Sequence, residues 1–321
     1  MTVEAGLGDD ARGGDGQDGN GQERTQLRIF DATLLPDSPP ADSFYRHRVG
    51  LFYALSSTWR NREVIWALAE RDVRASYKQA ALGMGWALLS PVLQIGLFTL
   101  LFDHIKTFHV KGVPYAIYAY AGLMCWTYFA GSLSAGGNSI VGNIALLNKT
   151  QFPRECFPLA QMLEQALYTV IGLIPLGILM GYLGFAPHIQ ILWGAPLCIA
   201  VELLFGIGLT LLFAASVVYV RDLVQVTSII TSLGLFATPV IWPLNKIQHV
   251  TFGPFHNVDF RPFYAFFNPL APVIDSVRNT MLLGREPDWL LLGIGAVSAL
   301  LYFVIGYTVF KRLEVGFADI S

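Results

Sequence analysis

Charged side chains are scarce in this chain of 321 residues: Asp, Glu, Lys and Arg make up only 14%, against about 25% in an average soluble domain. Six stretches carry no charged side chain at all: 79–102, 112–148, 165–201, 203–220, 223–245 and 289–310. Each is close to or above the roughly 20 residues that a helix needs to cross the hydrocarbon core of a bilayer. The composition therefore excludes an ordinary soluble domain and predicts a helical membrane protein.

Cysteine and ligand-spaced histidine are also nearly absent. The three cysteines, Cys125, Cys156 and Cys198, lie in or beside apolar blocks and form no CxxC pair. The six histidines lack the spacing of metal ligands. We therefore expect no disulfide framework and no metal site in the chain.

Catalytic and nucleotide-binding motifs are missing as well. The sequence has no GxxxxGK[ST] phosphate loop, so we expect this chain not to bind ATP by that route. It has no GxSxG or HExxH motif and no carboxylate cluster at a predicted membrane face, which disfavours a membrane-embedded enzyme. A secondary transporter is a further alternative. Such a transporter commonly has internal repeats around a site for coupling ions. No repeat is seen in this sequence, and the predicted spans hold only two acidic residues, Glu164 and Glu202.

The first 42 residues differ from the rest of the chain. They are rich in Gly and Asp, with nine acidic residues and three arginines, and have few large apolar side chains. Such a segment cannot bury enough surface to offset its chain entropy. We predict a disordered acidic tail over residues 1–42 and a membrane domain over residues 43–321.

The apolar blocks predict an all-α membrane protein with six transmembrane helices, at 82–102, 115–137, 159–184, 191–219, 224–242 and 289–310. An even number of spans puts both termini on one side of the membrane. The segments on that side hold twelve Lys and Arg residues outside the tail, and the opposite segments hold six. Because Lys and Arg are enriched in cytoplasmic loops, we expect both termini in the cytoplasm.

Residues 59–80, before the first span, show the pattern of an amphipathic helix. Spacings of three and four residues put one apolar set on a single stripe: Ile65, Trp66, Ala69, Val73 and Tyr77. A basic helix with a Trp on its apolar side suits the cytoplasmic membrane surface. The residues expected to act at that interface are Trp66, Arg71, Arg74, Tyr77 and Lys78. A soluble helix packed on another domain is the alternative, disfavoured because no second soluble domain is seen.

The longest connection on the predicted outer side runs from 246 to 288. It contains a second helical pattern in which Asn268 can cap, Pro269 suits the first position and Gly284 suits the stop. This helix is too short to span, so we expect it to dip into the outer leaflet beside protein, as a re-entrant gate. A helix lying on the outer surface is the alternative.

Aromatic side chains are abundant in and near the spans. Most are expected to pack or to form interfacial belts, but a minority could line a pathway, because aromatic faces stack on sugar rings. The candidate channel or gate residues are Trp86, Tyr118, Trp126, Glu202, Trp242, Phe263, Phe266 and Phe267.

Several stretches together resemble the permease subunits of type-2 ABC exporters of polysaccharides, a group that serves O-antigen, capsule, teichoic acid and galactan. The stretches, in the family's order, are REVIWALAERDVRASYKQAALGMGWALLSPVLQIGLFTLLF (62–102), YAGLMCWTYFAGSL, NIALLNKTQFPRECFPLA, VYVRDL, TPVIWPL, FNPLAPVIDSVRNTMLLG and LEVGFADIS. The likeness covers the chain from about residue 50 to its last residue. The long acidic tail departs from the family's pattern.

The resemblance implies a half-transporter of a bacterial plasma membrane. Two copies would pair, each bound to a separate ATP-hydrolysing subunit, so that ATP and Mg belong to that partner and no cofactor belongs to this chain. A lipid-linked glycan would leave between the two copies, past a pair of short outer gate helices. The lipid-linked glycan and membrane lipids are the other expected partners. No nucleic acid partner is expected. An exporter of drugs or small lipids with the same fold is the alternative.

The resemblance also implies a coupling helix after the second span, where the chain reads LNKTQFPREC (147–156). Here the apolar Phe152 is flanked by charged residues, and Pro153 blocks helix continuation. An apolar anchor with a charged rim can dock in a cleft of a motor subunit. The candidate coupling residues are Leu147, Lys149, Phe152, Pro153, Arg154 and Glu155. A loop that only sets topology is the alternative.

Overall fold

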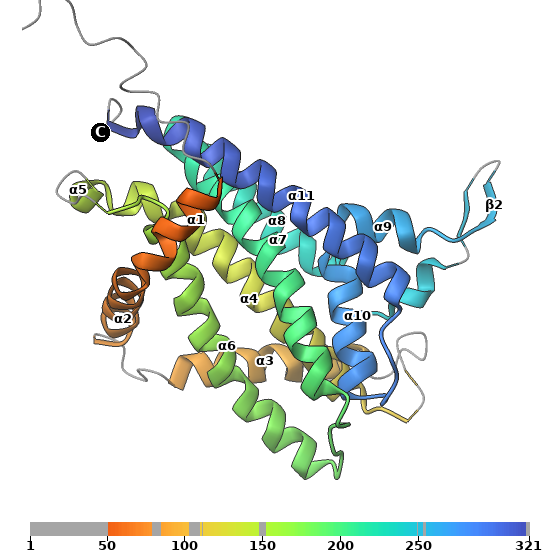
Figure 1. Ribbon diagram of the computed structural model, residues 1–321. Helices are drawn as coiled ribbons and strands as arrows, with labels where there is room; N and C mark the ends of the chain where they lie inside the picture. Colours follow the sequence, from red (N-terminus) through yellow and green to blue (C-terminus); the bar gives the residue numbers. More distant parts are fainter. Residues whose placement is uncertain are drawn as a thin grey trace, which may run out of the picture. The chain divides into compact units, whose positions relative to one another are not determined.

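The computed structural model describes residues 51–78, 85–102, 110, 112–147, 152–248, 250–252 and 255–318 (Figure 1). The predicted tail (1–42) and Lys149 lie outside the described residues. Apart from turns and loops, the described part is helical, with an isolated bridge between Val110 and Val113 and one hairpin of strands β1 (Val250–Phe252) and β2 (Phe255–Val258). The all-α class is therefore confirmed, while the hairpin was not predicted.

Within the described residues, three helices are long and apolar enough, by length and composition, to cross a membrane. They are α6 (Cys156–Tyr182), α7 (Ile191–Tyr219) and α11 (Trp289–Leu313), the last continued by the 3-10 turn η5 (Glu314–Ala318). The predicted span 191–219 coincides with α7, and the predicted spans 159–184 and 289–310 correspond to α6 and α11.

The other three predicted spans correspond to α3 (Gly85–Phe102), α4 (Tyr115–Gly142) and α8 (Leu223–Ala237). The helix α4 has 28 residues and is largely buried, whereas α8 has only 15 residues. The fifth span was predicted to end at residue 242, and this is wrong because α8 ends at Ala237. Thr238 is extended because the following Pro239 disfavours a helical conformation for the residue before it. The count of six spans stays a prediction.

Two shorter helices precede the first predicted span: α1 (Leu51–Arg60) and α2 (Arg62–Lys78). In α2 the side chains of Leu68 and Ala69 are buried in a cluster with the start of α6. Trp66 is 54% exposed and lies beside the face that carries Leu68 and Ala69. The predicted apolar stripe therefore does not coincide with the face of α2 that packs on the bundle. The helix thus has one face on the bundle and an exposed face that carries Trp66 and Arg74.

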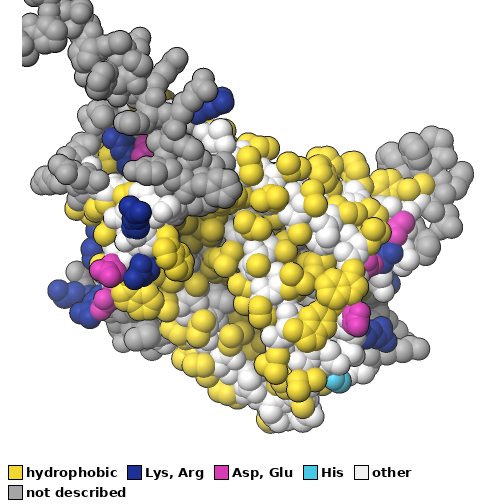
Figure 2. Space-filling model, viewed as in Figure 1, with side chains coloured by type: hydrophobic (Ala, Val, Ile, Leu, Met, Phe, Trp, Pro, Cys, Tyr) yellow, Lys and Arg dark blue, Asp and Glu magenta, His cyan; other side chains and the backbone are white. Residues whose placement is uncertain are grey.

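The helices α7 and α11 touch along their backbones. A Cβ atom on Gly306 would overlap the carbonyl oxygen of Gly208, so only glycine fits there. Small residues at such crossings let helices in a membrane approach closely. Figure 2 shows hydrophobic side chains over the middle of the face that includes α11. Charged side chains gather near α2 and near the end formed by α9 (Arg261–Phe267) and α10 (Leu270–Met281).

Replacing Gly306 by leucine is expected to lower the free energy of unfolding by about 1–3 kcal/mol, because the side chain has to separate two backbones. Thermal unfolding of the purified chain in detergent measures this loss. Gly293→Leu is the matched control in α11, because nothing lies within 4 Å of a Cβ atom at that position. Equal melting temperatures for the two variants would contradict the prediction.

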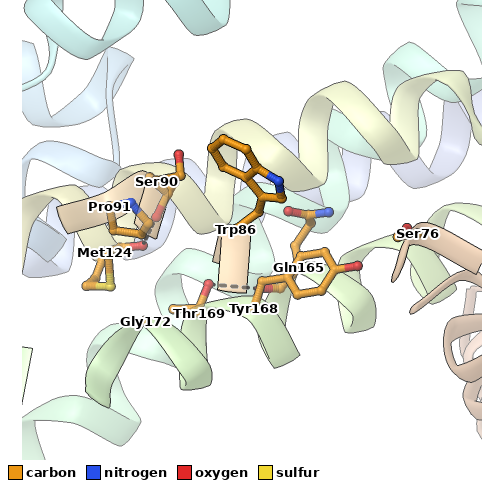
Figure 3. Close-up of a pocket in the computed structure, with 10 residues that line it drawn as sticks. Ser76, Trp86, Ser90, Pro91, Met124, Gln165, Tyr168, Thr169 and Gly172 are labelled. Carbon is orange, nitrogen blue, oxygen red and sulfur yellow. Dashed lines mark hydrogen bonds between the residues drawn. The ribbon is translucent and has the colours of Figure 1, made fainter. Parts of the chain in front are cut away.

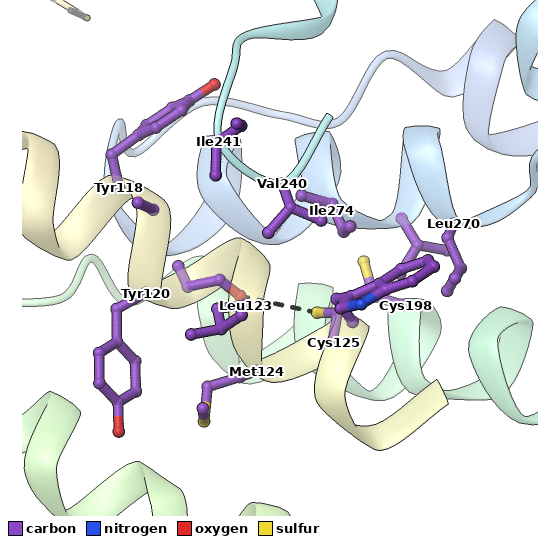
Figure 4. Close-up of a cluster of buried hydrophobic side chains, with 14 of the residues drawn as sticks. Tyr118, Tyr120, Leu123, Met124, Cys125, Cys198, Val240, Ile241, Leu270 and Ile274 are labelled. Atoms are coloured by element: carbon purple, nitrogen blue, oxygen red, sulfur yellow. Dashed lines mark hydrogen bonds between the residues drawn. The ribbon is translucent and has the colours of Figure 1, made fainter. Parts of the chain in front are cut away.

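The main core cluster gathers around α4, which contacts α6, α7, α8 and α3 (Figure 4). Leu123, Met124 and Cys125 of α4 meet Cys198 of α7 and Ile274 of a short helix, α10 (Leu270–Met281). The preceding helix is α9 (Arg261–Phe267), and the 3-10 turn η4 (Leu244–Ile247) follows α8. The core therefore includes α10 as well as the long helices, while Ala265 of α9 belongs to a separate small cluster.

Candidate transport and coupling sites

The predicted coupling segment follows the short helix α5 (Ile144–Leu147) and ends in a buried polar cluster. Glu155, which precedes α6, is fully buried. Its carboxylate accepts hydrogen bonds from Thr58 Oγ1 of α1 at 3.0 Å and Tyr307 Oη of α11 at 3.3 Å, and pairs with Lys311 Nζ at 2.8 Å. Lys311 also pairs with Glu314 at 2.9 Å. The cluster thus ties the segment to α1 and to the end of α11.

The expectation that Glu155 forms part of an exposed charged rim is therefore wrong, because that carboxylate is satisfied inside the chain. Arg154 donates a hydrogen bond to the backbone carbonyl of Glu314 and lies 5.6 Å from the ring centroid of Phe317. Leu147 is buried, while Phe152 and Pro153 are partly exposed. The ring of Phe152 lies 5.4 Å from that of Phe157. Arg154 is partly exposed as well, so the partly exposed part of the segment combines two apolar side chains with one cation.

The predicted interfacial residues lie on α2, with Arg71, Arg74 and Lys78 exposed and Tyr77 in the last turn. Arg71 donates a hydrogen bond to Asn143 Oδ1 at 3.0 Å, at the end of α4. Asp72 accepts one from Gln161 of α6 at 2.6 Å. Polar contacts therefore hold α2 against the ends of α4 and α6.

Glu164 of α6 faces the same helix. Its carboxylate is buried and accepts hydrogen bonds from Tyr168 at 2.5 Å and from Ser76 of α2 at 3.3 Å. The group is thus paired with hydroxyls at a helix contact. Its place in the structure is that of a link between α2 and α6.

The end of α8 is held by the segment that contains α9 and α10. Tyr264 of α9 donates a hydrogen bond to the Ala237 carbonyl, and Asn268 donates one to Thr238 Oγ1 at 2.9 Å. Asn268 therefore does not cap α10 as predicted; Pro269 occupies the capping position, and no side-chain cap is present there. Gly284 has a positive φ of 60°, which fits its predicted role as the stop after α10.

Arg278 of α10 completes this arrangement, and its side chain is only 1% exposed. Its guanidinium donates to the carbonyls of Tyr118 at 3.0 Å, Pro239 at 2.6 Å and Val240, and lies 3.8 Å from the ring centroid of Tyr118. A Cβ atom on Gly122 would overlap it. The carbonyls at a helix end need such partners where water is excluded. The sequence pattern showed one cation on an apolar helix but gave no sign of these partners.

The candidate channel residues fall into two groups. Tyr118, Trp126 and Glu202 are buried inside the single chain. The exposed group is Trp86, Phe263, Phe266 and Phe267, at 51%, 62%, 42% and 57% exposure, while Trp242 is partly exposed and donates to the Phe236 carbonyl at 3.0 Å. A pathway shared between two copies needs side chains at the surface of each copy. The exposed group lies at the surface of the chain, and the buried group packs inside it.

A groove of about 360 Å³ lies beside Trp86, between α3, α4 and α6 (Figure 3). Gln165 and Tyr168 of α6 lie next to the indole ring, and Thr169 is close by. Further polar lining comes from Ser76, Ser90 and Thr127. The groove thus combines an aromatic face with hydroxyl and amide groups. These groups can stack on a ring and form hydrogen bonds to hydroxyl groups that it carries.

No group of three or more His, Cys, Asp and Glu side chains that could hold a metal ion occurs within the described ranges. The buried Oε1 atom of Glu202 makes no hydrogen bond to the part of the chain that the structure describes. This carboxyl therefore has one oxygen without a protein partner inside the bundle.

Comparisons with known proteins agree with this architecture. The chain is similar to proteins named O-antigen export system permease protein RfbA. One from Myxococcus xanthus is 28% identical over 265 residues, covering 81% of this chain and 96% of that protein. Another, from Klebsiella pneumoniae, is 23% identical over 258 residues, covering 80% and 95%. The polysialic acid transport protein KpsM of Escherichia coli is 20% identical over 249 residues, covering 77% and 92%. Residues 63–282, more than half of the chain, match the family model of the ABC-2 type transporter, so the chain belongs to that family.

Proposed function

We propose that this chain is the membrane subunit of an ATP-driven exporter that moves a lipid-linked polysaccharide from the cytoplasm to the outer side of a bacterial plasma membrane. The names of the relatives support the substrate class, because they are O-antigen and polysialic acid transport proteins. Two copies pair and bind two separate ATP-binding subunits. ATP and Mg belong to those subunits, and both termini of this chain are cytoplasmic.

The observation that carries the substrate class is the groove beside Trp86. The exposed indole and the side chains of Gln165, Thr169 and Ser90 give a surface on which a sugar ring can stack while its hydroxyls form hydrogen bonds (Figure 3). An exporter of purely apolar drugs or lipids has no use for this polar lining. The exposed phenyl rings of α9 provide a second aromatic surface, on the outer helix pair.

In this proposal α3, α4 and α8 also cross the membrane, which gives six spans with α6, α7 and α11. The partly exposed Phe152 docks on the ATP-binding subunit, and the buried cluster behind it passes movement to α1 and α11. The α9–α10 pair forms the outer gate. Its hydrogen bonds to residues 237–240 make the end of α8 part of the same moving unit.

Replacing Trp86 by alanine is expected to lower export of the lipid-linked glycan about tenfold, since a lost aromatic contact corresponds to roughly 1–1.5 kcal/mol. Trp86→Phe should retain most of the activity because it keeps an aromatic face. Export is measured as lipid-linked glycan on each side of the membrane in cells that lack the wild-type gene.

Tyr182→Ala is the control, because Tyr182 is an aromatic residue with 86% exposure at the end of α6 and does not line the groove. If deletion of the gene leaves the lipid-linked glycan on both sides as before, the proposed function is wrong. If deletion stops export but Trp86→Ala does not reduce it, the groove is not part of the pathway.

A further inference from the structure

A second, larger groove lies on another face of the bundle, under the corner between α1 and α2. Its volume is about 670 Å³, within the roughly 300–1,000 Å³ of sites that hold drug-sized ligands. The floor is apolar and comes from three long helices: Leu159 and Leu163 of α6, Ile207 and Leu211 of α7, and Phe303 of α11. Such a floor suits an acyl chain.

The depth of the floor matches one leaflet of a bilayer. Ile207 lies twelve residues before the end of α7 at Tyr219, and Phe303 lies ten residues before the end of α11 at Leu313. At about 1.5 Å per residue these positions are roughly 18 Å and 15 Å from the helix ends. Half of a hydrocarbon core of about 30 Å is a similar distance. The groove therefore runs from the membrane surface to about the middle of the membrane.

Charged and aromatic side chains line its mouth. Trp59 and Trp66 are 73% and 54% exposed, and indole rings favour the level of the lipid head groups. Arg62 and Glu63 are adjacent, exposed and both line the groove. Neither forms an ion pair or side-chain hydrogen bond with any other residue that the structure describes. A cation and a neighbouring anion that have no partner among the described residues are complementary to a zwitterionic head group.

We infer that this groove binds a membrane phospholipid whose head group carries a phosphate and an amine, with phosphatidylethanolamine as the simplest example. Arg62 binds the phosphate, Glu63 binds the ammonium group and one acyl chain lies on the apolar floor. The site does not depend on the nature of the exported substrate. Thr58 and Tyr307 line the same groove and donate to Glu155, so the bound lipid packs against the cluster that holds the coupling segment.

The test uses the full-length chain, purified in detergent and titrated with phosphatidylethanolamine or phosphatidylglycerol of the same acyl chains. Bound lipid is counted by native mass spectrometry. The wild type should bind phosphatidylethanolamine more tightly than phosphatidylglycerol, which lacks the amine. Arg62→Gln should weaken phosphatidylethanolamine binding about tenfold through loss of a charge-assisted hydrogen bond. Glu63→Gln should abolish the preference between the two lipids.

Matched controls come from the same helix. Arg74 and Glu70 are exposed, pair with each other and do not line the groove, so Arg74→Gln and Glu70→Gln should leave lipid binding unchanged. Leu163→Trp, which fills the floor, should reduce the binding of both lipids. Equal effects of the Arg62 and Arg74 variants would overturn the proposal. So would tighter binding of a polyprenyl phosphate than of phosphatidylethanolamine, or a disulfide between two copies through Trp66→Cys.

Discussion

Replacing Arg278 by methionine is expected to destabilise the protein by about 2–6 kcal/mol. The guanidinium serves the carbonyls of Pro239 and Val240 beyond the end of α8, and each buried carbonyl left without a partner costs roughly 1–3 kcal/mol. The Tyr118 carbonyl also accepts from it but lies inside α4 and keeps its bond within the helix. The methionine side chain has a similar length but no donor. Arg278→Lys should fall between the two, because an ammonium group cannot reproduce the planar array of donors.

The expected effect is measured as the melting temperature in detergent and as export in cells. Arg285→Met is the matched control, because Arg285 follows α10 and is exposed. We expect proteolysis of Arg278→Met to cut first between α8 and α10, where the released carbonyls lie. A variant that melts and exports like Arg285→Met would show that the buried guanidinium does not hold the outer helix pair.

The long helices were accessible to sequence reasoning because they depend on local composition. The span 191–219 carries a single charged residue, Glu202, and became α7 with the predicted bounds. The same reasoning extended the fifth predicted span to residue 242, because apolar composition continues past the break at Pro239. Composition therefore predicts the apolar segments, whereas the end of α8 depends on the backbone geometry imposed by Pro239.

The polar links were not accessible, because their partners are distant in the chain. Glu155 was expected in an exposed rim, yet its partners Thr58 and Lys311 are 97 and 156 residues away in sequence. Arg278 was counted only as a charge on the outer side, and its acceptors are backbone carbonyls, which every residue carries. A buried charge can be seen in a sequence as a cation on an apolar helix, but what satisfies it depends on the fold.

These links have a mechanical consequence for the proposed exporter. The Glu155 cluster joins the predicted coupling segment to α1 and α11, and Arg278 joins the outer helix α10 to α4 and to the end of α8. Between them, α7 contacts α4, α10 and α11. Movement at the coupling segment can therefore reach the outer pair through packed helices, without a separate moving part.

Replacing Lys311 by methionine should uncouple ATP hydrolysis from export as well as destabilise the chain. Without the ammonium group the fully buried Glu155 keeps, among the described residues, the hydroxyls of Thr58 and Tyr307 as partners. Breaking a buried ion pair costs about 3–5 kcal/mol. The segment that carries Phe152 then loses its ion pair with α11 and keeps only the weaker hydrogen bond from Tyr307 to that helix. ATP hydrolysis and export are measured together in vesicles that contain both subunits.

The neighbouring Arg312 is exposed and supplies the matched control, because Arg312→Met removes a cation from the same helix end without touching Glu155. The exchanged pair Glu155→Lys with Lys311→Glu restores opposite charges at the same positions, so it should recover part of the lost stability and coupling. Comparing the double exchange with each single exchange separates the energy of the ion pair from the effects of the individual side chains. The amount of glycan exported per ATP hydrolysed is compared between Lys311→Met and Arg312→Met. If the two variants give the same ratio, movement of the segment reaches the bundle by another route, and the buried cluster serves folding alone.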